Sequence, residues 1–173
     1  MFIRIGAAIA ALFLLAGSAF AQSAKPTDPQ IAHIAYTAGQ IDIAAAQLAL
    51  KKSKNKDVRA FAADMERDHK AVNDKALALV KKLNVKPEDN PTSQQLSKQA
   101  SDKRAELSKL NGAAFDKAYI DNEVAYHKTV NGALQNTLIP SASNQELKDL
   151  LTTGLKIFQG HEHHAEHVAA DFK

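Results

Sequence analysis

The feature that most constrains the fold is a long stripe of apolar residues between positions 58 and 83. Its members recur at alternating steps of four and three: Val58, Ala62, Met65, Val72, Ala76, Leu79 and Leu83. This is the spacing of one buried face on a long α-helix. The same series passes through position 69, which is His69. The stripe therefore predicts a core helix that carries an imidazole on its buried face.

Glu66 precedes His69 by one helical turn, so the two side chains occupy neighbouring positions on the helix surface. A lone histidine in an apolar stripe has two interpretations. It is either a hydrogen-bonded core residue or a metal ligand. The choice depends on whether other helices bring similar groups to the same level.

Residues 1–21 have the pattern of a secretory signal peptide. Arg4 precedes an apolar run, and an Ala-Phe-Ala cleavage sequence ends at Ala21, so we expect cleavage between Ala21 and Gln22. The run is shorter than the roughly 20 residues that a membrane-spanning helix needs. The chain also has no cysteine for lipid attachment. We therefore expect an exported protein with no transmembrane segment after cleavage, located in the periplasm of a bacterium with two membranes.

The composition of the chain points to one all-helical domain. Residues 22–173 are enough to bury a core, and cysteine is absent although the expected compartment permits disulfides, so stability must come from the core or from core and metal. Tryptophan is also absent, glycine and proline are few, and Ala, Leu, Lys and Gln are abundant. The formal charge of +3 is spread without a long basic tract. We therefore expect no nucleic-acid partner.

Four long helices and one shorter helix account for the rest of the pattern. The long helices are expected at about residues 29–52, 56–83, 114–138 and 144–170, and the shorter, polar one at about 93–110. Ile139-Pro140 is expected to end the third long helix. The shorter helix has only a thin apolar stripe, which predicts a crossover on the flank of the bundle. The fold class is therefore predicted as an all-α four-helix bundle with an extra crossover helix between helices two and three.

Each long helix also carries an ionisable residue on its apolar face. These inward residues are Asp42, Glu66, His69, Glu123, His127 and His161. His164 falls at the edge of the same face of the last helix, while His163 and His167 point outward. Helices of about 25 residues, packed side by side, share a midplane whichever way each one runs. We therefore expect the inward groups to meet in one layer within roughly 6 Å of that plane.

Such a layer of buried ionisable groups would be costly without partners, because an unpaired buried charge costs several kcal/mol. Two solutions remain open. The groups either satisfy one another through Asp–His and Glu–His hydrogen bonds, or they bind a transition metal such as iron, zinc or copper. Di-iron bundles use Glu-x-x-His motifs on two helices. Here only the helix with Glu66 and His69 has that motif, so ferroxidase chemistry does not follow.

Several motifs together suggest a family relationship. They are Phe61-Ala62, Met65, Asp68-His69, Phe115-Asp116-x-x-Tyr119, Glu123-Val-Ala-Tyr-His127, Leu138-Ile-Pro140 and Phe158-x-x-His161. In these motifs the chain resembles a family of exported bacterial proteins of unknown function, domain of unknown function 4142, whose members are often labelled outer-membrane or periplasmic proteins. The resemblance covers nearly the whole mature chain and implies a ferritin-like four-helix bundle. It implies that Asp68, His69, His127 and His161 occupy the family's typical positions.

The chain also departs from that family pattern. Asp42 stands where the family often has Glu, and Lys156 and Glu162 replace a usual Pro and Leu. Because the family has no established activity, the resemblance bears on fold and location and leaves function open.

Two functions of different classes fit these observations. The first is an exported metal-binding bundle with a role in metal handling or stress. Its ligands would be Asp42, Glu66, His69, Glu123, His127 and His161, with Asp68 and His164 at the edge. The second is a non-catalytic envelope protein that binds a partner protein or a second copy of itself, with the polar layer acting as a structural hydrogen-bond network. A third class, a hydrolase, is the least favoured, because there is no nucleophile motif, Gly-rich loop or Ser-His-Asp pattern. We predict no catalytic residue, and the question of enzymatic activity stays open with a non-enzyme favoured.

Overall fold

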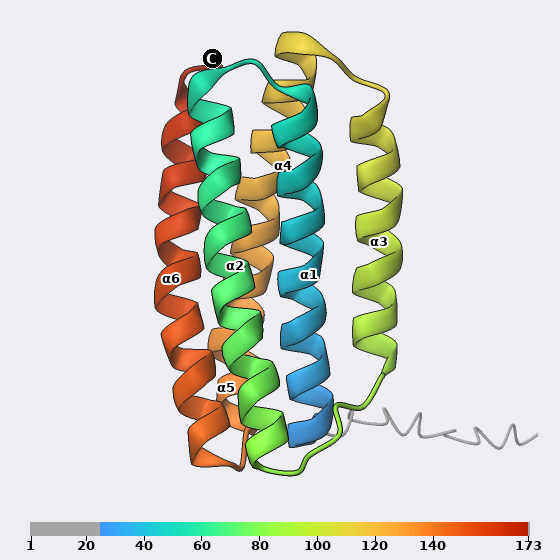
Figure 1. Cartoon of the computed structure of the whole chain (residues 1–173), viewed down its shortest axis with the longest axis vertical. Helices are drawn as coiled ribbons and strands as arrows, with labels where there is room; N and C mark the ends of the chain where they lie inside the picture. The colour runs from blue at the N-terminus through green and yellow to red at the C-terminus, as the bar shows by residue number, and fades with distance from the viewer. Residues whose placement is uncertain (1–24, 173) are drawn as a thin grey trace, which may run out of the picture.

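The computed structural model describes residues 25–172, so the predicted signal peptide and its cleavage site lie outside the described residues. Within this range the regular structure is entirely helical (Figure 1). The long helices of the bundle are α1 (Asp28–Lys52), α2 (Lys56–Lys82), α4 (Gly112–Ala133) and α6 (Gln145–Ala170). The described helices include none that is long and apolar enough to cross a membrane. The prediction of an all-α bundle is confirmed.

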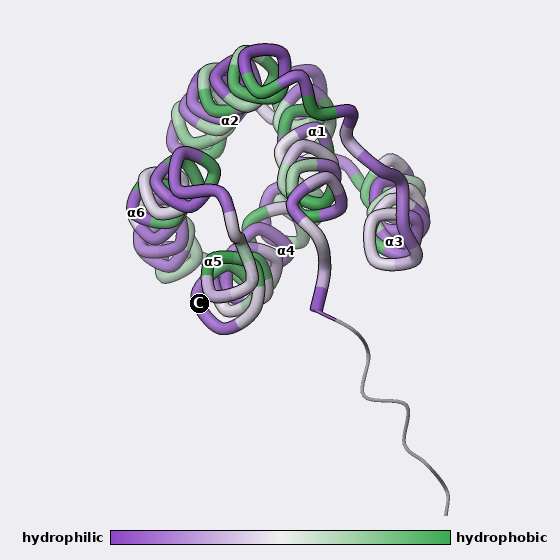
Figure 2. Tube along the Cα trace, turned by 90° about the horizontal axis from the view of Figure 1, so that it is seen from below, coloured by the Kyte–Doolittle hydropathy of each residue, from purple (hydrophilic) through white to green (hydrophobic). Residues whose placement is uncertain are grey.

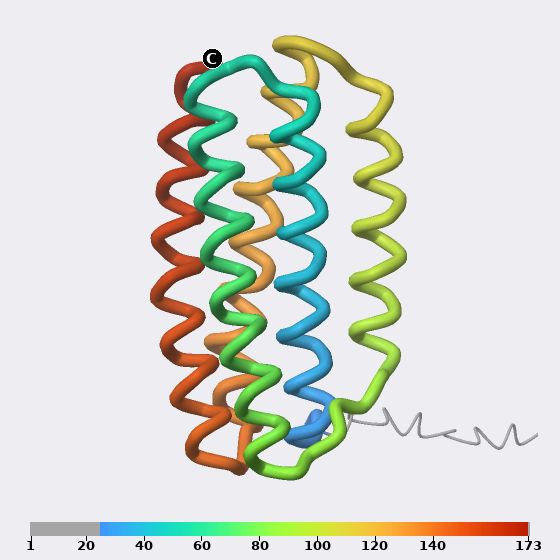
Figure 3. The backbone as a smooth tube through the Cα atoms, viewed as in Figure 1, coloured from blue at the N-terminus to red at the C-terminus, as the bar shows by residue number. Residues whose placement is uncertain are grey.

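The four long helices form a ring in the order α1, α2, α6, α4, seen along the bundle axis in Figure 2. The backbone trace in Figure 3 shows that each helix runs opposite to its two neighbours in this ring. This arrangement requires one connection that travels the length of the bundle. It is supplied by α3 (Pro91–Ser108), which returns the chain from the end of α2 to the start of α4. A single long crossover of this kind is typical of ferritin-like bundles.

The crossover helix α3 lies outside the ring, against α1, as Figure 2 shows. Of its residues only Ser93 and Leu107 are buried, which agrees with the thin apolar stripe in its sequence. It begins at Pro91, two residues earlier than expected, because the side chain of Asn90 accepts a hydrogen bond from the backbone N–H of Ser93 at 3.1 Å. Asn90 is therefore the N-cap of α3.

The third long helix does not end at Ile139-Pro140, and this part of the prediction is wrong. After Ala133 the chain continues through a π-helical turn, η1 (Leu134–Leu138), and a further helical turn, α5 (Ile139–Ser141). Proline removes a backbone N–H donor and crowds the preceding turn of a regular α-helix. The wider π-helical turn directly before Pro140 accommodates both effects. The helical path stops only where Ala142 adopts an extended backbone, with ψ 128°.

The apolar core consists of two clusters that lie at opposite ends of the bundle. The upper core, at the end where α1 meets α2, is centred on the residues Val58, Phe61, Met65, Phe115, Tyr119 and Ile120, all 0% exposed. The lower core contains the residues Ile31, Ile34, Leu134, Leu138, Leu147, Leu151 and Phe158. Between the two clusters lies a layer of polar side chains, which is the candidate functional site.

Candidate metal centre

Five ionisable side chains meet between the upper and lower cores. They are Asp42 from α1, His69 from α2, Glu123 and His127 from α4, and His161 from α6. Each is no more than 6% exposed. We refer to these five residues as the polar layer. Every long helix of the bundle thus contributes at least one ionisable group at this level.

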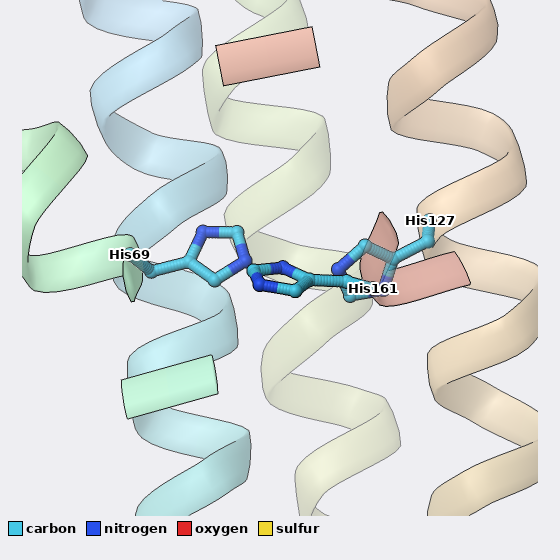
Figure 4. A group of neighbouring side chains, drawn as sticks. All are labelled: His69, His127 and His161. Atoms are coloured by element: carbon cyan, nitrogen blue, oxygen red, sulfur yellow. The ribbon is translucent and has the colours of Figure 1, made fainter. Parts of the chain in front are cut away.

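The three imidazoles of the polar layer form a nearly equilateral triangle. Ring centroids are 5.8 Å apart for His69 and His127, 5.3 Å for His69 and His161, and 5.6 Å for His127 and His161. Figure 4 shows the three side chains at one height, converging from three helices. One ring nitrogen from each lies within 4.8 Å of the others. Nitrogens about 2.1 Å from one tetrahedral ion stand roughly 3.4 Å apart, so small side-chain rotations would complete the site.

Hydrogen bonds fix which nitrogen of His127 and of His161 carries the proton. In His127, Nδ1 lies 2.9 Å from the backbone carbonyl of Glu123, which can only accept, so Nδ1 donates and Nε2 keeps a free lone pair. In His161, Nε2 lies 3.1 Å from the Asp68 carboxylate, so Nε2 donates and Nδ1 keeps the lone pair. Metal-binding histidines are commonly held in this way by a carbonyl or carboxylate on the opposite nitrogen.

Asp68 is itself held by Arg67. The guanidinium donates two hydrogen bonds to the carboxylate, from Nε to Oδ1 at 2.7 Å and from Nη2 to Oδ2 at 3.0 Å. These bonds lower the pKa of Asp68, with a further lowering contribution from His161. The carboxylate therefore remains an anionic acceptor for the His161 ring.

The third imidazole, that of His69, is oriented by stacking rather than by hydrogen bonds. Its ring lies parallel to that of Phe158, with centroids 4.4 Å apart and an interplanar angle of 8°. Its Nε2 is 3.3 Å from Oδ2 of Asp42, but without hydrogen-bond geometry, and neither ring nitrogen has a partner. His69 thus presents its nitrogens to the layer while an aromatic ring fixes its plane.

Burial keeps all three imidazoles neutral at pH 7. It lowers the pKa of His127 to about 4, and it also lowers the pKa of His69 and of His161. Neighbouring imidazoles add to the effect at His69 and His127. The neutral imidazole is the form that binds a metal ion.

The two carboxyl groups of the layer, Asp42 and Glu123, behave as a coupled pair. Burial raises the pKa of Asp42 well above its ordinary value, and the nearby Glu123 raises it further. Burial also raises the pKa of Glu123, to about 7. Two adjacent buried carboxyl groups do not both ionise readily, so the pair retains a proton near neutral pH.

The polar layer holds most of the unsatisfied buried polar atoms. Among the described residues, ten buried side-chain nitrogen or oxygen atoms lack a hydrogen-bond partner. Six of them belong to the layer: Asp42 Oδ1, His69 Nδ1 and Nε2, Glu123 Oε2, His127 Nε2 and His161 Nδ1. Folded proteins leave few such atoms unpaired, because each costs desolvation energy. Most of these atoms offer a lone pair, and the only protons among them are the one N–H of neutral His69 and the proton that the carboxyl pair retains, so the layer is rich in the electron-pair donors that a cation needs.

Two overlapping sets of ligands are available in the layer. One is the imidazole triangle, and the other consists of Asp42, Glu123 and His127. His127 has a single free lone pair, because its Nδ1–H is bonded to the Glu123 carbonyl. It can therefore ligate in only one set at a time. The layer is suited to one ion rather than to a pair of ions.

The structure brings together five of the six inward residues expected from the sequence, but not Glu66. The Glu66 carboxylate faces the outer edge between α1 and α2, where it accepts hydrogen bonds from Lys70 at 2.7 Å and Gln47 at 3.0 Å. Both partners lie outside the core, so the expectation that Glu66 shares the buried face with His69 is corrected. His164 also stays at the edge, packed against Phe61 with 39% of its side chain exposed.

Three features of the site were not anticipated from the sequence. These are the stacking of Phe158 on His69, the pairing of Asp42 with Glu123, and the support of Asp68 by Arg67. The spacing Phe158-x-x-His161 places the phenyl ring one turn from an inward imidazole and is the one signal that pointed to the first of them.

Together the fold and the site define a ferritin-like helical bundle with a buried histidine and carboxylate layer. The chain belongs to the family described as Domain of unknown function (DUF4142), whose model matches residues 15–168. This confirms the family resemblance.

The fold is also similar to that of a DUF305 protein from Streptomyces coelicolor, whose name describes it as a candidate secreted protein. The TM-score is 0.70 at 9% identity, over 83% of this chain and 91% of that chain. At this identity the likeness shows the fold alone. No curated protein matches the chain.

Proposed function

We propose that this protein is an exported metal-binding bundle that holds one transition-metal ion at His69, His127 and His161. The observation that carries the proposal is the convergence of three neutral imidazoles with free ring nitrogens in a buried layer. Asp42, whose Oδ2 is 3.3 Å from Nε2 of His69, and its neighbour Glu123 would supply the fourth ligand and the negative charge that a divalent cation requires. On binding, the pair gives up the proton that it retains near neutral pH.

The ligand set narrows the choice of metal. Three imidazoles with a carboxylate suit Zn²⁺, Cu²⁺ and Fe²⁺, whereas Mg²⁺ and Ca²⁺ prefer oxygen ligands alone. The polar layer contains no sulfur ligand, which disfavours Cu⁺. Zinc, copper and iron are therefore the ions to test first.

The proposed location is the periplasm, after cleavage between Ala21 and Gln22. The signal-peptide pattern of residues 1–21 supports export, and the family is one of exported proteins by the resemblance described above. A periplasmic protein with a buried imidazole site fits a role in metal handling or in the response to metal or oxidative stress.

Metal analysis of untagged protein purified from the periplasm tests the proposal. We expect about one ion per chain, and loss of that ion in the double variant His69→Ala, His127→Ala. The matched control is His163→Ala, His167→Ala, which removes two imidazoles outside the polar layer and should keep the metal. Metal-free protein whose melting temperature does not change on adding Zn²⁺, Cu²⁺, Fe²⁺ or Mn²⁺ would refute the proposal.

The second candidate function is a non-catalytic envelope protein that binds a partner, with the layer serving only to fix the packing of the helices. It is favoured by the bonds that already satisfy part of the layer, from His127 to the Glu123 carbonyl and from His161 to Asp68. This alternative predicts that His69→Ala lowers stability while metal content is nil in both proteins. It also predicts recovery of one specific partner or of a homo-oligomer.

A further inference from the structure

The lower half of the bundle contains a cavity of about 900 Å³ that the polar layer does not use. It is lined mainly by α1, α2, α6 and the α4–η1 segment, the helices that surround the bundle axis in Figure 2, and it is open toward residues 25–27 and the start of α3, which also line it. Its wall is mainly apolar and includes Ile34, Val72, Leu134 and Leu151. A volume of this size lies within the range of about 300–1,000 Å³ typical of small-molecule sites.

The sequence leaves this space open because small residues occupy the inner positions around it. Ala35, Ala38, Ala76 and Gly154 all line the cavity, one or more from each of three helices. The upper core instead contains large aromatic residues that are fully buried. In the lower core, Leu138, Leu147, Leu151 and Phe158 keep 5–9% of their surface exposed. The lower half is therefore less completely packed than the upper half.

The cavity extends along the bundle, and polar side chains line part of its wall. Leu147 and Phe158, which both line the cavity, are about three turns of α6 apart, roughly 16 Å. Gln30, Asn90 and Thr92 form a polar rim at the end of the bundle where α1 and α3 begin, and Asn73 and Thr129 line the wall nearer the polar layer. Of the described residues that line the cavity, Lys25 alone is charged, and it lies at this rim.

We propose that the cavity binds a single-chain fatty acid. The acyl chain would lie along the apolar wall toward Phe158, and the carboxylate would remain at the polar rim near Lys25. The depth of about 16 Å fits a medium-length chain, and the single positive charge at the rim matches a monoanionic head. The proposal does not depend on metal binding, because none of the three imidazoles lines the cavity.

Calorimetric titration of the metal-free mature protein with saturated fatty acids below their micellar concentrations tests this assignment. We expect saturable binding of one molecule per chain, strongest near laurate or myristate and weaker for octanoate and stearate. Dodecanol, which lacks the carboxylate, should bind about tenfold more weakly than laurate, equivalent to about 1.4 kcal/mol. Absence of binding at every chain length would overturn the proposal.

Two phenylalanine substitutions on α2 provide a matched comparison. Ala76→Phe fills the cavity and should reduce laurate binding at least roughly tenfold, whereas Ala78→Phe places the same ring on the exposed side of α2 and should leave binding unchanged. If Ala76→Phe fails to fold, the smaller insertion Ala35→Leu on α1 replaces it. Laurate binding that is equally strong in a folded cavity-filling variant would show that the site is elsewhere and would refute the assignment.

Discussion

At the scale of single residues, the two ring nitrogens of His127 and of His161 in the polar layer differ: one donates a hydrogen bond and the other keeps a free lone pair. One nitrogen of His161 is held by Asp68 and one nitrogen of His127 by the Glu123 carbonyl, while the opposite nitrogen of each ring stays free. The hydrogen-bond acceptor of each ring therefore decides which of its nitrogens is free to bind a metal ion. This dependence can be measured by changing the acceptor alone.

Asp68→Asn should weaken metal binding by roughly 10–100-fold with little change in stability. The amide is neutral and can present its NH₂ group to His161, which would place the ring proton on the wrong nitrogen. The Asp68 side chain is 27% exposed, so the substitution leaves no large buried defect. Competition with a chelating dye measures the affinity. Asp64→Asn removes another carboxylate paired with Arg67 and serves as the control; equal losses in both variants would contradict a specific role for Asp68.

Glu123→Gln should change how the stability of the metal-free protein depends on pH. The folded-state pKa of Glu123 is about 7, above its ordinary value of 4.5, so the folded protein holds the extra proton between these values. The contribution of Glu123 to stability is therefore present below pH 4.5 and is lost as the pH rises through 7. The free energy of unfolding of the wild type should fall relative to the variant between pH 5 and 8, by roughly 3 kcal/mol at most. Urea unfolding in the presence of a chelator measures the difference; parallel curves would contradict it.

At the scale of helices, the spacing of apolar residues was sufficient to predict which segments pack in the core and that α3 lies outside it. What the spacing did not predict was local detail: the direction of a single side chain and the end of one helix. Glu66 and His69 are one turn apart, but an offset of that size is enough to turn the carboxylate toward Lys70 and Gln47. Similarly, Pro140 normally marks a helix end, and the π-helical turn before it depends on tertiary packing that no short motif records.

A helix boundary that the sequence does specify is the start of α2. The side chain of Asn55 accepts hydrogen bonds from the backbone N–H groups of Asp57 at 2.9 Å and Val58 at 3.3 Å. Asn55→Ala should lower the free energy of unfolding by about 1 kcal/mol, because these two donors lose their acceptor. Urea unfolding measures the change, with Lys54→Ala as a neighbouring control. No difference between the two variants would show that solvent replaces the cap without cost.

At the scale of the whole molecule, the polar layer lies between two apolar cores that differ in how completely they are packed. The upper core is fully packed, the lower core contains the cavity, and the layer draws one or two residues from each of the four long helices. Helices of matched length made this convergence predictable from their midpoints alone. The side-chain contacts within the layer were not predictable, because they depend on helix rotations of a few tens of degrees that the apolar spacing does not fix.

Because its ligands come from different helices, a bound ion should stabilise the whole bundle cooperatively. An ion that binds only the folded state at about 100 times its dissociation constant adds about 3 kcal/mol. For a domain of this size, that stabilisation raises the melting temperature by roughly 5–10 °C. Differential scanning calorimetry with Zn²⁺, before and after EDTA, measures the shift. We expect it in the wild type and in His163→Ala, and expect it to be absent in His127→Gln, which lacks a ligand of the imidazole triangle. An equal shift in His127→Gln would place the stabilising ion on the protein surface, outside the polar layer.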